Sequence, residues 1–307
     1  PVARLYLESL SAGKPHSYCY SGPVFRTRPG ESSEFIQAGI ESFGRSDREA
    51  ADAEILARAL EALQSADAGA VDVRLGDTGL FNALLNALGL APLWVRKLKR
   101  AFAKGILTRE TLDELADFVP PTSQHAGLLG TLEGQDPKAA RAFVEDLLKI
   151  AGISSVGGRS AAEIAERFLS QASNETAGSL TKEARTILAR YCDIEGPPDD
   201  VSTDLRTLSD DADLKLDPVL DAYDTRIGFI AARGIKPQDL TFSTRFGRNL
   251  DYYTGAVFEV RNAGLPESKP IVGGGRYDRL LQSLGAAEPI PAVGCAIFID
   301  RLAGVTI

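Results

Sequence analysis

Residues 248 to 259 combine side chains that suit the binding of a small zwitterion. Arg248, Tyr252 and Tyr253 come directly before the apolar run that starts at residue 256. A guanidinium can donate two parallel hydrogen bonds to a carboxylate, and a tyrosine offers both a ring face and a hydroxyl. The same pattern is also typical of an edge strand that carries surface aromatics. This stretch alone leaves a ligand site and a purely structural strand equally open.

Other residue types that often do chemistry are sparse. His16 and His125 lie in loop-like sequence without a nearby Ser, Cys or carboxylate pattern, which favours surface histidines over an acid or base catalyst. Residues 273 to 276, Gly-Gly-Gly-Arg, lack the spacing of a phosphate-binding loop and are typical of a tight strand-to-helix turn. The three cysteines are far apart and odd in number, which indicates reduced thiols. We therefore expect no metal ion.

Two groups of strands, one near each end of the chain, would position the candidate residues. Alternating patterns predict a hairpin from residues 17 to 26 and 35 to 43, around a polar tip. Apolar residues at helical spacing predict a helix over 47 to 63, and strand character returns over 71 to 75. A further helix is expected over 276 to 284. The remaining strands are expected over residues 241 to 245, 252 to 261, 270 to 273 and 292 to 298.

The middle of the chain changes to short amphipathic helices with Gly and Pro breaks. We interpret residues 79 to 210 as a helical insertion that divides a core of residues 1 to 78 and 211 to 307. Residues 197 to 200 read as a turn, and a helix is expected from Asp217 to Gly234, with Pro at N1. The fold class is therefore α+β, with a mostly antiparallel sheet.

The overall charge argues against nucleic acid as a partner. The 34 Lys and Arg residues and 42 Asp and Glu residues give a formal net charge of −8, whereas phosphate neutralisation supplies most nucleic-acid affinity. The basic run at 94 to 100 is typical of a solvated helix face. No apolar run reaches the ~18 to 20 residues of a membrane span, and no signal peptide is recognisable. We expect a cytoplasmic protein without a nucleic-acid or membrane partner.

Four segments, in order along the chain, resemble histidyl-tRNA synthetase. They are residues 22 to 26 with 35 to 41, 248 to 259, 273 to 278, and 291 to 302. Their shared order makes the resemblance specific, although the middle of the chain matches the synthetase poorly. The resemblance implies a class II aminoacyl-tRNA synthetase-like fold, in which helices flank an antiparallel sheet. Residues 1 to 4 resemble the segment just after the first histidine-binding motif, so we expect further residues before Pro1.

The resemblance also implies a histidine site. Gln37 matches a ligand of the α-amino group, Glu41 a partner of the imidazole, and Arg248 the arginine at the carboxylate. Tyr253 and Tyr277 match tyrosines around the ring. The full set of residues that we assign to histidine is Gln37, Glu41, Arg248, Tyr252, Tyr253, Gly274 and Tyr277.

Arg26 and Arg301 match the two arginines that hold ATP phosphates in the synthetase. The synthetase places an adenine-contacting glutamate two residues after the first of these, where this chain has Arg28. The following loop is also shorter by about three residues. We therefore interpret Arg26 and Arg301 as a vestigial nucleotide site, and we expect no cofactor and no catalytic side chain.

The function implied by the resemblance is regulatory. Five residues follow Leu302, so we expect no anticodon-binding domain. Residues 75 to 85 and 155 to 160 resemble the regulatory subunits of ATP phosphoribosyltransferase, a family of synthetase paralogues. That family implies a non-catalytic subunit that binds L-histidine and couples it to a short-form catalytic subunit in the first step of histidine biosynthesis. A homodimer within a hetero-oligomer is expected. The alternative is a histidyl-tRNA synthetase core fragment that forms histidyl-adenylate.

Overall fold

A twisted sheet organises the computed structural model. The structure describes residues 1–9, 11–27, 32–116, 180–247, 252–263 and 269–303, with 142, 143, 145, 146, 150, 155, 156, 159 and 160. Within these ranges the sheet has eight strands, in the order β1-β2-β10-β9-β8-β3-β7-β6. The strands are β1 (His16–Phe25), β2 (Glu34–Phe43), β3 (Val71–Asp77), β6 (Glu195–Gly196), β7 (Leu240–Ser243), β8 (Ala256–Asn262), β9 (Val272–Arg276) and β10 (Ala292–Phe298).

Neighbouring strands of this sheet run antiparallel except β3 and β7, which pair in parallel. The predicted hairpin is confirmed as β1 and β2, in which Gly22 pairs with Gln37 and Tyr18 with Glu41. Since side chains alternate between the faces of a strand, Gln37 and Glu41 lie on one face and the intervening Ile40 lies on the other. The hairpin therefore presents the two candidate polar residues together.

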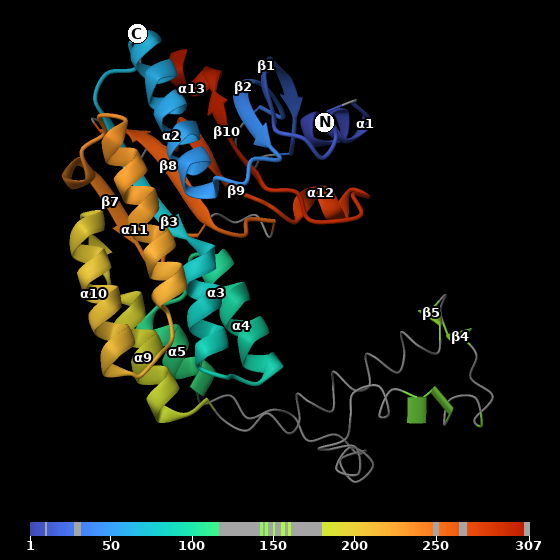
Figure 1. Ribbon diagram of the computed structural model, residues 1–307, viewed down its shortest axis with the longest axis vertical. Helices are drawn as coiled ribbons and strands as arrows, with labels where there is room; N and C mark the ends of the chain where they lie inside the picture. The colour runs from blue at the N-terminus through green and yellow to red at the C-terminus, as the bar shows by residue number, and fades with distance from the viewer. Residues whose placement is uncertain are drawn as a thin grey trace.

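Two long helices cover the opposite face, as Figure 1 shows. They are α2 (Arg48–Ser65) and α11 (Asp217–Ala232), which pack against each other and confirm the two helices expected there. Their buried residues include Leu56 and Leu63 of α2 and Ile227 of α11, which share one apolar core with Cys295 and Ile297 of β10. Removing this apolar surface from water drives the packing.

Further helices gather beyond one end of the sheet (Figure 1). They are α3 (Thr78–Ala87), α4 (Pro92–Ala103), α5 (Arg109–Ala116), α9 (Lys182–Cys192) and α10 (Pro198–Asp211). The turn predicted at 197 to 200 is wrong, because Pro198 begins α10 with Asp199 and Asp200 in its first turn. Proline is tolerated at that position, where the N–H has no intrahelical partner, and acidic residues suit the helix dipole. Two paired dipeptides, β4 (Ser155–Val156) and β5 (Arg159–Ser160), form a separate ladder.

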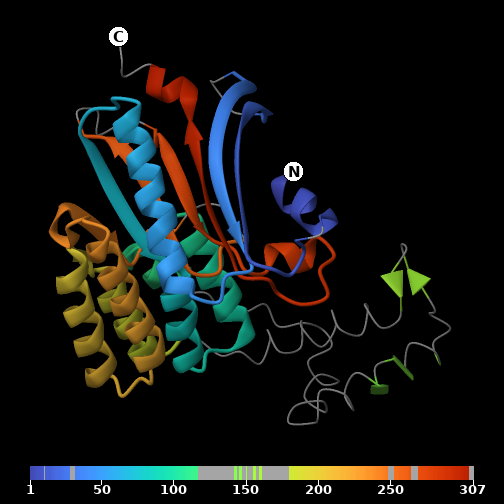
Figure 2. The same ribbon diagram turned by 45° about the horizontal axis from the view of Figure 1, so that its top comes forward.

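Three further short α-helices are α1 (Val2–Glu8), α12 (Leu280–Ser283) and α13 (Ile299–Ala303), and a 3₁₀ helix, η1, covers Pro237–Asp239. Figure 2 shows α1 beside the hairpin, and α1 contacts α12. Between them lies a small second core that contains Tyr6, Phe43, Tyr277 and Leu281. The rings of Tyr6 and Phe43 stack with centroids 4.6 Å apart. This core fixes the segment that carries Tyr277. None of the helices in the described ranges is long and apolar enough to cross a membrane.

Candidate functional site

The face of the sheet away from α2 and α11 carries a carboxylate at its centre. Glu41 of β2 pairs in register with Gly294 of β10 and accepts a hydrogen bond at Oε2 from the hydroxyl of Tyr277. Burial raises the pKa of Glu41 to about 7, although the hydrogen bond from Tyr277 opposes this shift. A ligand N–H that donated a hydrogen bond to Glu41 would stabilise its ionised form and so lower this pKa.

A glycine makes room for this carboxylate. A Cβ placed on Gly294 would lie 1.7 Å from Oε2 of Glu41, which no side chain permits. On the other side of Glu41, a Cβ on Gly39 would lie 2.4 Å from the ring of Tyr20. Glycine at both positions lets polar side chains lie flat against the strands.

Gln37 and Tyr20 extend the polar surface along the hairpin. The Nε2 of Gln37 donates to the hydroxyl of Tyr20 over 2.6 Å, so the carbonyl oxygen of Gln37 is the atom that can accept from an ammonium group. Burial, followed by the charge of Glu41, raises the pKa of Tyr20 to about 12, which keeps the phenol neutral. The sequence reasoning missed Tyr20. Its place opposite Gly39 in the hairpin register was the available signal.

Three tyrosines form an aromatic wall. The rings of Tyr252 and Tyr253 lie 4.7 Å apart, and Tyr252 meets Tyr277 edge-on at 5.8 Å. A Cβ on Gly275 would lie 2.8 Å from the ring of Tyr253, so β9 lies directly under that ring. The structure therefore brings Tyr252, Tyr253 and Tyr277 together, as the sequence analysis expects of histidine-binding residues.

A buried ion network holds the turn that carries Tyr277. Arg276 donates from Nε to Asp52 over 2.8 Å and from Nη1 to Asp278 over 2.9 Å. Asp278 also accepts from the backbone N–H of Ala292 over 2.9 Å. Arg226 of α11 completes the network through Asp52 at 3.0 Å. Since both neighbours of Tyr277 are fixed, its hydroxyl is held toward Glu41. Sequence reasoning did not single out Asp52 or Arg226.

The other predicted site residues have different surroundings. A Cβ on Gly274 would meet Phe258, which belongs to the helix-covered core, so Gly274 faces away from Glu41. Arg301 donates to the carbonyl of Pro270 over 2.5 Å and lies over the ring of Phe298. Arg26 is exposed at the end of β1. Arg248 lies outside the described residues, as does Arg28.

Comparisons of sequence match this chain along nearly its whole length to histidyl-tRNA synthetases and to ATP phosphoribosyltransferase regulatory subunits. Residues 1–143 and 139–302 match the model for histidyl-tRNA synthetase. The chain is 39% identical to the ATP phosphoribosyltransferase regulatory subunit of Brucella anthropi, over 98% of this chain and 80% of that protein. The regulatory subunit of Brucella canis is 38% identical over the same shares of the two chains.

Solved structures share the fold. A protein of Bacillus halodurans described as an ATP phosphoribosyltransferase regulatory subunit/histidyl-tRNA synthetase matches 99% of this chain with a TM-score of 0.61 and 22% identity. Histidyl-tRNA synthetase from Nostoc matches 99% with a TM-score of 0.60 and 20% identity. The chain spans 62% and 58% of those two chains. The expected class II synthetase-like fold is confirmed.

Proposed function

Since this chain belongs to the family of ATP phosphoribosyltransferase regulatory subunits, we propose that it binds free L-histidine and passes that signal to a catalytic partner. The ligand would lie on the open face of the sheet, between Glu41 and the aromatic wall of Tyr252, Tyr253 and Tyr277. The observation that carries this proposal is the half-buried Glu41 carboxylate, held by Tyr277 and on the same strand face as Gln37.

Each polar group of histidine would have a complementary partner among the residues that we assign to the site. An imidazole N–H would donate to Glu41, and the ring would pack against Tyr253. The ammonium group would donate to the free carbonyl oxygen of Gln37, because its amide nitrogen already bonds to Tyr20. We assign the ligand carboxylate to Arg248, whose guanidinium fork suits that group. A ligand without the imidazole would leave Glu41 with Tyr277 as its donor but without a ligand N–H, which costs binding free energy and gives specificity.

Regulation requires histidine to bind one state of an assembly better than another. The coupling is limited to that difference in binding free energy, typically ~1 to 3 kcal/mol. We propose that the partner is the short-form ATP phosphoribosyltransferase catalytic subunit, that the transfer chemistry belongs to the partner, and that this chain pairs as a homodimer within the complex. The process is the first step of histidine biosynthesis, in the cytoplasm.

Co-purification tests this proposal. The chain is expressed with a tagged short-form transferase, and the complex is assayed with and without histidine. A stable complex whose activity responds to histidine supports the proposal. Absence of a complex contradicts the partner, and a complex that ignores histidine contradicts the sensor role. Exchange of pyrophosphate into ATP that depends on histidine would instead identify an adenylate-forming enzyme.

A further inference from the structure

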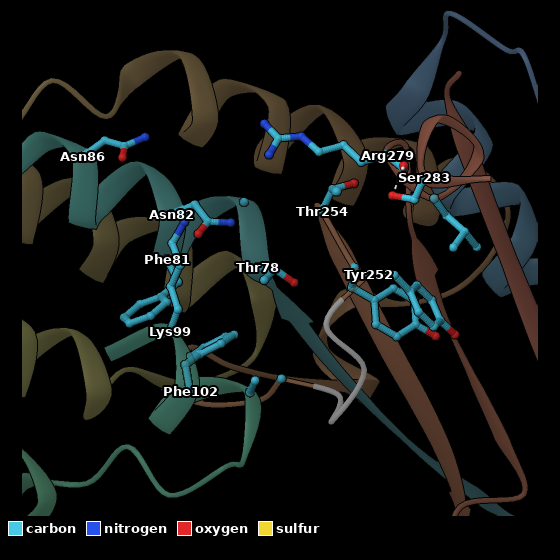
Figure 3. A pocket seen from close by; sticks show the side chains of 15 residues that line it. Thr78, Phe81, Asn82, Asn86, Lys99, Phe102, Tyr252, Thr254, Arg279 and Ser283 are labelled. Atoms are coloured by element: carbon cyan, nitrogen blue, oxygen red, sulfur yellow. Dashed lines mark hydrogen bonds between the residues drawn. The ribbon is translucent and has the colours of Figure 1, made fainter. Parts of the chain in front are cut away.

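A cavity adjoins the aromatic wall at Tyr252 and Tyr253. It has a volume of 560 Å³ and lies between α3 and α4 on one side and Tyr252, Tyr253 and α12 on the other. Figure 3 shows its lining side chains. Small-molecule sites typically have ~300 to 1,000 Å³. Tyr252 and Tyr253 line this cavity but Glu41 and Gln37 do not, so it adjoins the surface that we assign to the imidazole and amino group and has its own polar groups.

The charge of the cavity lining is positive. Lys99 of α4 and Arg279, just before α12, both line it, and among the described lining residues there is no Asp or Glu. In Figure 3 the Arg279 side chain extends toward α3, which carries Asn82 and Asn86. This positive site is unexpected in a chain with a net charge of −8.

In the part of the chain that the structure describes, two carboxylates lie next to lining residues in sequence, and neither neutralises the cavity. Asp77 precedes the lining residue Thr78 but bonds to Arg226 over 2.7 Å. Asp278 precedes Arg279 but bonds to Arg276 over 2.9 Å. Both carboxylates already pair with arginines of the buried network, so the charges of Lys99 and Arg279 remain available to a ligand.

The rest of the lining combines neutral hydrogen-bonding groups with aromatic surface. Thr78, Asn82 and Ser283 supply hydroxyl or amide groups. Phe102 stacks on Phe81 with ring centroids 4.4 Å apart, and both line the cavity. Tyr252 adds a ring that is 36% exposed. A purely ionic site would not need these aromatic rings.

We propose that this cavity binds a small phosphorylated molecule, with its phosphate between Lys99 and Arg279. An arginine fork recognises phosphate oxygens directionally, and a lysine adds a point charge. Two cations from separate elements, with neutral donors between them, match a dianion better than a single carboxylate. The remainder of the molecule would pack against Tyr252, which is the exposed ring of the lining. This proposal goes beyond histidine binding, since histidine carries no phosphate.

Calorimetric titration with inorganic pyrophosphate and inorganic phosphate tests the site. We expect saturable pyrophosphate binding that weakens about tenfold or more, equivalent to about 1.4 kcal/mol, in Lys99→Gln/Arg279→Gln. Arg100→Gln is the matched control, because it removes the same charge from α4 outside the cavity lining. Its affinity should stay within about twofold of the unchanged protein. Thermal unfolding checks that each variant is folded. If the double variant does not fold, the single variant Lys99→Gln is titrated in its place.

Three results would overturn the proposal. The first is that the unchanged protein shows no saturable binding of pyrophosphate. The second is that Arg100→Gln loses as much affinity as Lys99→Gln/Arg279→Gln. The third is that succinate, a dicarboxylate titrated as a comparison, binds as tightly as pyrophosphate. The last would identify a carboxylate site. Each result is independent of whether histidine binds to the surface around Glu41.

Discussion

At the scale of single residues, the open face depends on the ionisation of Glu41. Two groups near this carboxylate, the phenol of Tyr20 and the thiol of Cys295, have raised pKa values. Burial, followed by the charge of Glu41, raises each pKa to about 12. Both therefore stay neutral at physiological pH. Glu41 is thus the group of this cluster whose charge can change near neutral pH.

We predict that Glu41→Gln weakens histidine binding by about 1.5 to 3 kcal/mol, because a hydrogen bond to an ionised group contributes more than a neutral one. Isothermal titration calorimetry measures this loss. Glu34→Gln is the control, since Glu34 is an exposed residue of the same strand. Unchanged affinity in Glu41→Gln would place the ligand elsewhere.

The pKa of Glu41 also predicts how stability without ligand depends on pH. The folded chain holds this proton up to about pH 7, whereas the unfolded chain releases it near the ordinary pKa of 4.5. The folded state therefore binds more protons between these values, and the free energy of unfolding falls as pH rises from 4.5 to 7. We expect the loss, relative to Glu41→Gln, to reach up to about 3 kcal/mol. Chemical denaturation of both proteins at pH 5 and pH 8 measures it; parallel profiles would contradict the prediction.

At the scale of elements, the site depends on close strands and on one buried ion network. Gly294 of β10 and Gly39 of β2 allow their strands to lie against the side chains of Glu41 and Tyr20. Asp52 joins α2 to β9 through Arg276 and to α11 through Arg226. The two features act on different sides of the sheet, and each can be tested separately.

We predict that Gly294→Ala displaces Glu41, because the added methyl group would overlap its carboxylate. Overpacking of this kind costs about 1 to 3 kcal/mol of stability, and histidine affinity should fall with it. The matched control is Gly22→Ala in β1, where an added Cβ meets nothing within 4 Å. Equal histidine affinities of the two variants in calorimetry would show that the close approach is unimportant.

Asp52→Asn should destabilise the fold by about 3 to 5 kcal/mol, because Arg226 and Arg276 would remain buried without their shared carboxylate. Urea denaturation measures this change. Glu61→Gln provides the comparison on the same helix, since its ion pair with Arg58 is exposed and should contribute less than about 1 kcal/mol. A small effect at Asp52 would mean that the network does not hold the turn.

At the scale of the whole molecule, two ligand surfaces are proposed that share one aromatic wall. One is centred on Glu41, and the other on Lys99 and Arg279. Outside the second surface, net negative charge dominates the chain. Long-range electrostatics therefore oppose polyanions even though a small phosphate fits locally.

We expect tRNA to bind more weakly than micromolar at physiological salt, because the net charge of −8 gives little counterion release. Fluorescence anisotropy with labelled tRNA, at several salt concentrations, measures both affinity and its salt dependence. Sub-micromolar binding at physiological salt would contradict this expectation.

Much of the fold could be predicted from local sequence. The hairpin, α2 and α11 were predicted from patterns among neighbouring residues: alternation, helical spacing and a proline at the first turn. All three elements are confirmed, with small shifts of their ends. The motif order also fixed the family. The turn expected at Pro198 failed because proline is compatible with both a turn and a helix start, and only packing of α10 decides between them.

The sequence by itself determined the hairpin, β10, the fold family and the candidate residues of β2. The strand expected from residue 252 begins at Ala256, and the helix expected over 276 to 284 covers only Leu280–Ser283, because β9 continues to Arg276. Only the tertiary structure decided which of the candidate residues meet. Tyr277 reaches Glu41, and Gly274 faces the helices, because strand register sets the face of every residue. Tyr20 and Asp52 were missed because their partners are distant in sequence or on another strand. The Lys99 and Arg279 cavity arises from residues 180 positions apart, which packing alone brings together.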